Sequence, residues 1–150
     1  MNPVVSIGQP LKHYVWGAGC DGWNLVDQPE LSVKQERMPP HTAEAEHFHR
    51  QSRQFFFILS GTAVFVCTGV YLSNLPPGAN GLISGLRPAV LWTAFETSEG
   101  RVEVGPQQGF EIAPGVKHRI KNESEVDLVF LLCSQPSTLN DRIEAPAGFE

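Results

Sequence analysis

The sequence predicts a single domain built almost entirely from short β-strands. Twelve prolines and fourteen glycines in 150 residues interrupt the chain often, and so many turns favour many short strands over a few helices. No stretch shows helical periodicity over more than two turns, whereas several alternate apolar and polar residues as half-buried strands do. A chain of this length can bury about 70% of its unfolded surface, so its core needs no disulfide bonds.

The composition argues against several classes of protein. The net charge of −5 leaves no basic stripe to neutralise nucleic-acid phosphates. No apolar run approaches the roughly 20 residues that span a membrane, and Met1–Pro10 shows no signal peptide. Three widely spaced cysteines without a Cys-x-x-Cys pair are typical of reduced thiols. We therefore expect a cytoplasmic protein that binds neither nucleic acid nor membrane.

The N-terminal part is expected to contain two or three strands. Residues 1–13 are interpreted as an N-terminal arm with few features that would hold it against the rest of the domain. Aromatic residues and turn glycines over 14–23 fit a strand, a tight turn and the start of another strand. Residues 31–37 alternate as a half-exposed strand, which a proline pair then ends. Trp16 and Trp23 could line a pocket mouth, although packing in the core or in a dimer interface is the more common role of Trp.

The most informative stretch contains two histidines one residue apart, His47 and His49. In extended backbone, side chains two residues apart point to the same face. We expect one strand over 42–49 with both imidazoles directed inward. Glu44 and Glu46 fall on the opposite parity and are therefore expected to point outward into solvent.

A buried aromatic strand follows after a polar turn. It begins at Gln54, runs through Phe56 and ends at the turn residue Gly61, and a further strand is expected over 62–68. The pattern then gives way to loop-forming prolines and glycines. We interpret residues 67–92 as an insertion that is either a lid over the site or an inert loop.

The C-terminal part repeats this strand-and-turn pattern. Strands are expected over 90–97, 101–104, 109–112, 116–122 and 127–134. Pro114 and Gly115 turn the chain, after which His118 and Ile120 share one face and basic residues share the other. Residues 135–150 are interpreted as a tail that forms a short helix or wraps a partner.

The spacing of these residues resembles the two sequence motifs of the cupin superfamily. The matching positions are His47, His49, Gln54 and Gly61 in the first motif, and Pro114, Gly115, His118 and Asn122 in the second. The match covers about residues 39–134, and the aromatic run after Gln54 also resembles small single-domain bacterial cupins. The resemblance implies an all-β, antiparallel jelly-roll barrel (a double-stranded β-helix) that spans residues 1–150 as one domain.

The resemblance also implies a metal ion inside the barrel, held by His47, His49 and His118 with a fourth ligand from position 54. Gln54 stands where the motif usually has Glu, and a neutral amide cancels none of the ion's charge. Gln54 is either a direct ligand of the ion or a residue that does not touch the ion. In the second case three histidines bind the ion and leave other coordination positions open. Imidazole suits Zn, Fe, Ni, Mn and Cu, so we expect one divalent transition metal ion of open identity.

Histidines can also be core or surface residues that bind no metal. His13 and His41 lie outside the motif spacing and are expected at the surface. The other three share inward parity at cupin spacing, which favours a metal site.

The leading functional hypothesis is a metal-dependent enzyme acting on a small organic molecule inside the barrel. We expect its pocket to be rimmed by Phe56, Phe110 and Trp23. Oxygenase, isomerase and cyclase activities all occur among cupins, and the fold does not choose between them, so no catalytic residue is assigned. The alternatives are a non-catalytic barrel that binds or senses a small ligand, and a metal-free structural barrel, which the retained ligand set disfavours. The family also implies a homodimer paired through sheet edges.

Overall fold

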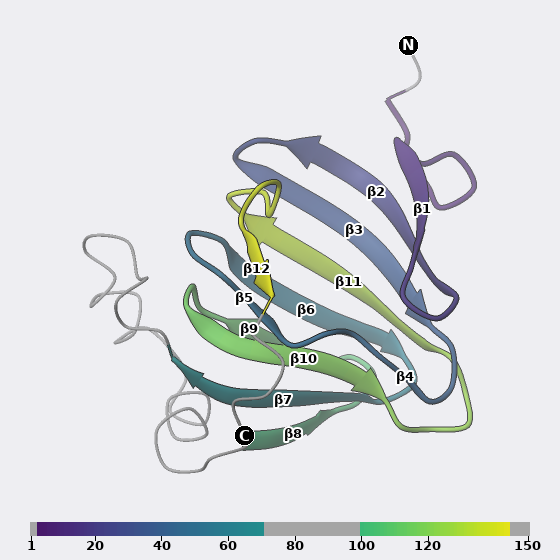
Figure 1. The fold of residues 1–150 in the computed structure, drawn as a ribbon. Helices are drawn as coiled ribbons and strands as arrows, with labels where there is room; N and C mark the ends of the chain where they lie inside the picture. The colour runs from purple at the N-terminus through teal and green to yellow at the C-terminus, as the bar shows by residue number, and fades with distance from the viewer. Residues whose placement is uncertain (1–2, 71–99, 145–150) are drawn as a thin grey trace.

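Two antiparallel β-sheets face each other across an apolar core (Figure 1). The computed structural model describes residues 3–70 and 100–144, which form strands and turns. Within these two ranges no helix is long and apolar enough to cross a membrane. The arrangement confirms the predicted all-β, jelly-roll fold.

The first sheet has the strand order β1-β2-β3-β11-β6-β9. Its strands are β1 (Lys12–Trp16), β2 (Cys20–Gln28), β3 (Leu31–Met38), β11 (Leu128–Gln135), β6 (Arg53–Ser60) and β9 (Gly109–Ile112). The second sheet has the order β12-β5-β10-β7-β8, and β4 also pairs with β10. Its strands are β12 (Arg142–Glu144), β5 (His47–His49), β10 (Val116–Asn122), β7 (Ala63–Val70), β8 (Gly100–Val104) and β4 (Thr42–Ala43).

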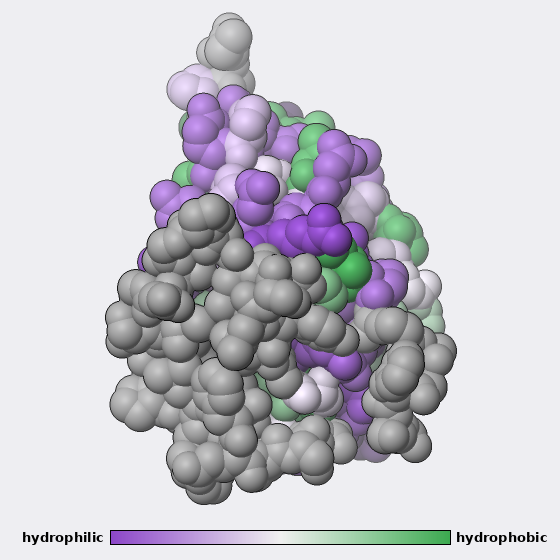
Figure 2. All heavy atoms as spheres, turned by 60° about the vertical axis from the view of Figure 1, so that its left-hand side comes forward, coloured by the Kyte–Doolittle hydropathy of each residue, from purple (hydrophilic) through white to green (hydrophobic). Residues whose placement is uncertain are grey.

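The core lies between the sheets and is built around three phenylalanines. Phe65 of β7 is fully buried, and its ring centroid lies 4.9 Å from that of Phe56 and 4.6 Å from that of Phe110. These rings join the two sheets, since Phe56 and Phe110 belong to β6 and β9. On the outside, Figure 2 shows a face where hydrophilic side chains predominate over the upper part and hydrophobic residues form small separate areas.

Gly61 makes the turn between β6 and β7, as predicted. Its φ of +80° lies in the left-handed region that side chains disfavour, and a Cβ there would come within 2.6 Å of the backbone oxygen of Asp127. Only glycine therefore allows the chain to pass this close to the start of β11.

Segment boundaries differ from the predicted ones at both ends of the chain. The predicted arm contributes its last two residues to β1, and an isolated bridge joins Ser6 and Gln9. The predicted tail forms no helix in its described part; Gln135 ends β11, and Arg142–Glu144 return as β12 beside β5.

The middle of the chain differs in two further ways. Residues 67–70, predicted as the start of the insertion, belong to β7. The rest of the predicted insertion and the predicted strand over 90–97 lie outside the described residues. The predicted single strand over 42–49 is in fact two short strands, β4 and β5, separated at Glu44–Glu46.

Candidate metal centre

Three histidines from two neighbouring strands form one buried cluster. His47 and His49 come from β5, and His118 of β10 lies directly opposite His47 in the strand register. The three residues are 2%, 4% and 1% exposed. One possible ligand atom from each lies within 4.8 Å of the others. The structure therefore brings together the three histidines that the sequence predicted as ligands.

Hydrogen bonds to the backbone fix the tautomer of all three rings. Each Nδ1 faces a carbonyl oxygen, which can only accept, so Nδ1 carries the proton and Nε2 keeps its lone pair. The acceptors for His47, His49 and His118 are the oxygens of Ala45, Asp141 and Val116, at 2.8, 3.2 and 2.8 Å. The Nε2 atoms of His49 and His118 are buried without a hydrogen-bond partner. Oriented imidazoles with unpaired Nε2 atoms fit a divalent transition metal ion.

The electrostatics of the cluster favour neutral rings. Burial lowers the pKa of His47 to about 2 and that of His118 to about 3, and it also lowers the pKa of His49. Imidazole binds metal only in its neutral form, so no proton has to leave the cluster near neutral pH.

This shift makes the metal-free protein sensitive to acid. A histidine whose pKa is lower in the folded state contributes stability above its unfolded pKa of about 6.5, and that stability is lost as pH falls toward the folded pKa. Each of the three can cost up to about 1.4 kcal/mol per pH unit below that value. Glu44, whose pKa is raised to about 8, and Glu36, whose pKa burial also raises, act in the opposite direction, but as two groups against three. We expect the free energy of unfolding of chelator-treated protein to fall between pH 6.5 and 4, as measured by urea denaturation.

A variant provides the control for this pH dependence. His118→Ala should show a shallower slope, and His41→Ala, which changes an exposed residue bonded to Glu125, should show the parental slope. Stability that stays level or rises on acidification would contradict the argument.

Gln54 lies on β6 beside the cluster and is also buried. Its Nε2 donates to the hydroxyl oxygen of Ser134 at 3.2 Å, while its Oε1 is buried without a partner. The hydrogen bond to Ser134 therefore orients the Gln54 amide and leaves its Oε1 atom unpaired. Gln54, His47 and His49 line one cavity of about 750 Å³.

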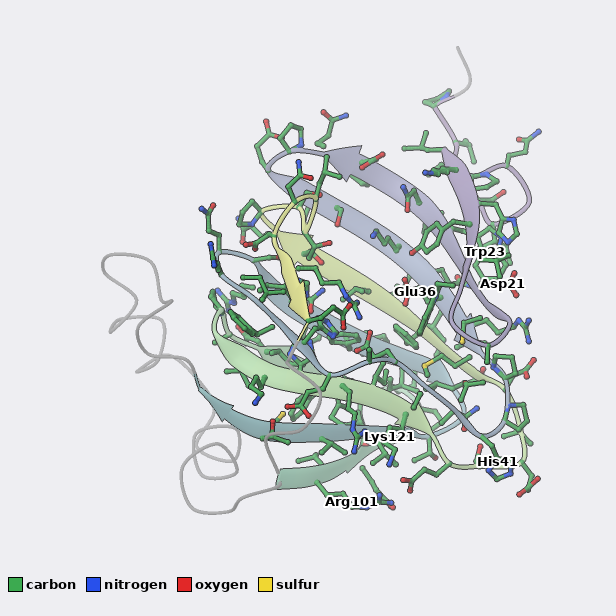
Figure 3. All side chains as sticks on the ribbon, viewed as in Figure 1. Asp21, Trp23, Glu36, His41, Arg101 and Lys121 are labelled. Atoms are coloured by element: carbon green, nitrogen blue, oxygen red, sulfur yellow. The ribbon has the colours of Figure 1, made fainter. Side chains whose placement is uncertain are left out.

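The predicted pocket residues occupy different environments. Phe56 lines the cavity. Phe110 and Trp23 are not among the described residues that line it: Phe110 stacks on Phe65 in the core. Trp23 stacks on His13, with 5.5 Å between ring centroids, and lies near Asp21 at the β1 edge of the sheet (Figure 3).

Glu44 lines the cavity instead of pointing outward, so its predicted orientation was wrong. Its side chain is 12% exposed; Oε1 accepts a hydrogen bond from the backbone N–H of Ile120 at 3.1 Å, and Oε2 lies 3.6 Å from Nη1 of Arg142. Burial raises its pKa to about 8, an effect that Arg142 partly opposes. The prediction assumed strict alternation through to His47, whereas β4 ends at Ala43. Only a weak signal in the sequence marks the break in the strand here, namely that Glu and Ala are both poor strand formers.

A second carboxyl group, that of Glu36, also lines the cavity and was not predicted (Figure 3). The hydroxyl group of Tyr14 donates to its Oε1 at 2.5 Å. The tyrosine ring crosses Gly22, where a Cβ would lie 2.0 Å from the ring. Burial raises the pKa of Glu36, and burial beside this carboxyl group raises the pKa of Tyr14.

Asp141, just before β12, supports the histidine strand from behind. Its backbone oxygen accepts from His49, and its carboxylate accepts from the backbone N–H groups of residues 50–52 at 2.8 to 3.3 Å. β12 itself pairs with β5 (Figure 1). Asp141 therefore holds the turn at residues 50–52, which directly follows the candidate ligands His47 and His49.

Asp141→Ala is expected to weaken metal binding without removing any ligand. Loss of groups that orient metal ligands typically costs about 10- to 100-fold in affinity, and the uncapped N–H groups should lower stability by about 1–3 kcal/mol. Zinc titration against a competing chelator and urea denaturation measure the two effects. Asp127→Ala, which removes an exposed carboxylate paired with Arg37, is the control; equal zinc affinity in both variants would exclude the supporting role.

Solved structures with the cupin fold are similar to the whole described chain. CapF bound to the inhibitor 3-isopropenyl-tropolone aligns over 93% of this chain and 35% of its own, with a TM-score of 0.66 and 16% identity. A sugar phosphate isomerase of the cupin superfamily from Silicibacter pomeroyi aligns over 90% and 76%, with a TM-score of 0.61 and 14% identity. A conserved double-stranded β-helix protein from Klebsiella pneumoniae aligns over 97% and 99%, with a TM-score of 0.63 and 12% identity.

These similarities establish the fold. This chain spans about a third of CapF but nearly all of the Klebsiella protein. No family model matches the sequence, and neither does any curated protein. The chain has the cupin fold, and its three-histidine cluster is a donor set that could hold a metal ion.

Proposed function

We propose that this protein is a metal-dependent enzyme that moves a proton on a small organic molecule bound in the cavity. The observation that carries the proposal is the histidine cluster: the Nε2 atoms of His49 and His118 have no hydrogen-bond partner among the described residues, and His47 and His49 line a cavity of about 750 Å³. A cavity of this volume is in the range of small-molecule sites. When bound, a divalent ion would supply Lewis acidity toward an oxygen atom of the substrate.

The donor set on this chain is uncharged. His47, His49 and His118 bind as neutral imidazoles, and we propose Gln54 as the fourth donor because its Oε1 is buried and unpaired. None of these groups cancels the charge of a divalent ion. The centre therefore favours a substrate that brings an anionic oxygen.

Glu44 is the proposed acid–base residue. It lines the cavity together with His47 and His49. A general acid or base works best when its pKa lies near the working pH, and burial raises the pKa of Glu44 to about 8. The hydrogen bond from Ile120 and the nearby Arg142 fix the position of its carboxyl group. Among the activities known for cupins, this group supports isomerisation, and one structural neighbour is a sugar phosphate isomerase.

The test is exchange of substrate hydrogen with solvent. Zinc- or manganese-loaded protein in D₂O is incubated with hydroxy ketones, keto acids and sugar phosphates, and deuterium incorporation is followed by NMR. We expect Glu44→Gln to lower the exchange rate by about 10²- to 10⁴-fold, the usual contribution of a general acid or base.

Glu46→Gln is the matched control, because Glu46 is the same residue type two positions away and pairs with Thr68 and Lys117 instead. Tight ligand retention with no exchange in the parent protein would favour the alternative, a non-catalytic binding barrel. Equal rates in the two variants would exclude Glu44 as the acid–base residue.

We further propose a homodimer paired through the edge strand β1. Val15 on that strand and Leu11 before it are 65% and 61% exposed, and an exposed apolar edge strand is usually covered. A light-scattering mass equal to one chain would contradict the dimer.

A further inference from the structure

The inner surface of β1, β2 and β3 is polar where it lines the cavity. In one row across the sheet, Lys12, Asn24 and Lys34 lie directly opposite one another. The next row contains Tyr14 and Glu36, with Gly22 between them. All of these residues except Gly22 line the cavity that His47 and His49 also line. A sheet that only closed the barrel would be expected to bury apolar residues here.

Two buried polar atoms of this surface have no hydrogen-bond partner among the described residues. Asn24 is 8% exposed, and its Oδ1 is buried without a hydrogen bond. The indole Nε1 of Trp16, another residue of the cavity lining, is also buried and unpaired. An unpaired buried polar atom lowers stability and is rare in folded proteins. An acceptor and a donor left unpaired on one cavity wall indicate groups that pair with a bound molecule.

The chemistry of this wall suits hydroxyl groups. A hydroxyl group both donates and accepts, so one ligand can satisfy Asn24 and Trp16 together. The rings of Tyr14 and Trp16 add apolar surface for the C–H groups of the same ligand. Lys34 has its Nζ 5.5 Å from the centroid of the Tyr14 ring, and the buried carboxyl group of Glu36 lies two residues away on the same face.

The register also sets the length of the ligand. Lys34 is opposite Leu132 of β11, and Leu132 is opposite Phe56 of β6. Three strand spacings and one two-residue step therefore separate Asn24 from Gln54, or about 15 Å along the curved sheet. The side chains at both ends point into the cavity and shorten this span, but a two- or three-carbon acid is still too short to reach both.

We propose that the wall formed by Trp16, Asn24 and the Tyr14–Glu36 pair is a subsite for the hydroxyl groups of a sugar-like acid or phosphate. The oxyanion end of the same molecule lies at the histidine cluster. Only the placement of the oxyanion at the histidines rests on the proposed function. The hydroxyl subsite is built from β1, β2 and β3, which carry none of the three histidines.

The test compares two carboxylates of equal chain length, D-gluconate and 2-hydroxyhexanoate, by calorimetric titration of zinc-loaded protein. Both offer the same α-hydroxy carboxylate to the metal, and only gluconate carries further hydroxyl groups along the chain. We expect gluconate to bind at least roughly tenfold more tightly, the effect of one or two hydrogen bonds. Asn24→Leu, which fills the same space with an apolar group, should remove most of the difference, and Trp16→Phe should reduce it.

Gln35→Leu is the control. Gln35 is next to Lys34 in the sequence, but its side chain is not among those that line the cavity, so this variant removes an amide outside the proposed subsite. Equal affinities for the two carboxylates in the parent protein, or a preference that survives in Asn24→Leu, would overturn the subsite. No binding of gluconate at millimolar concentration would also overturn it. A gluconate affinity that is the same with and without zinc would support the subsite while contradicting the proposed metal function.

Discussion

His118→Ala is expected to abolish stable metal binding. Structural sites with four ligands bind zinc with about 10–16 kcal/mol, or roughly 3–4 kcal/mol per ligand. Removal of one ligand should therefore weaken zinc binding by about 100- to 1,000-fold. The parent protein is expected to keep one equivalent of zinc through dialysis and the variant none, as measured by mass spectrometry of the metal content. Circular dichroism checks that the variant is folded.

His41→Ala is the matched control for this prediction. His41 is an exposed histidine bonded to Glu125, and Figure 3 shows it in the loop at the lower right, beyond the ends of the strands. We expect this variant to keep the full equivalent of zinc. If His118→Ala and His41→Ala retain equal amounts of metal, the three-histidine centre is the wrong assignment.

Phe65→Ala is expected to cause the largest loss of stability. Its ring is fully buried between Phe56 and Phe110, so removal leaves a cavity and breaks the contact that joins the two sheets. Such substitutions cost about 3–5 kcal/mol, which for a domain of this size lowers Tm by about 10 °C or more. Differential scanning calorimetry of the metal-free protein measures the effect without a contribution from ligand binding.

Phe55→Ala is the control with the same change in side chain. Phe55 is 39% exposed on the outer face of β6, next in sequence to Phe56, and its loss should cost less than half as much. Comparable losses in both variants would show that the core does not depend on the aromatic cluster.

The spacing of a few residues carried the resemblance to the cupin superfamily, and that resemblance predicted the fold and the three histidines. His47 and His49 share a face in any extended strand, and the turn at Pro114–Gly115 sets the parity of His118. That prediction needed no knowledge of which strands pair. The structure then places His118 opposite His47 in the register.

The rest of the site depends on features that parity does not reveal. Glu44 turns inward because the strand breaks between β4 and β5, and a break of this kind has only a weak sequence signal. Asn24 reaches the cavity through the pairing of three strands, and Asp141 reaches His49 across about ninety residues of sequence. Long-range pairings of this kind are decided by the whole fold and not by the local pattern.

The return of β12 to β5 also bears on when the proposed metal site can form. During synthesis His47 and His49 are made first, His118 follows about seventy residues later, and the strand that supports them comes later still. At about 5–20 residues per second the third ligand appears roughly 4–14 s after the first two. We therefore expect metal to bind only after His118 and β12 have been made, and not when His47 and His49 alone are available. The ion found in purified protein should then reflect the metals available to the folded protein, including those of the growth medium.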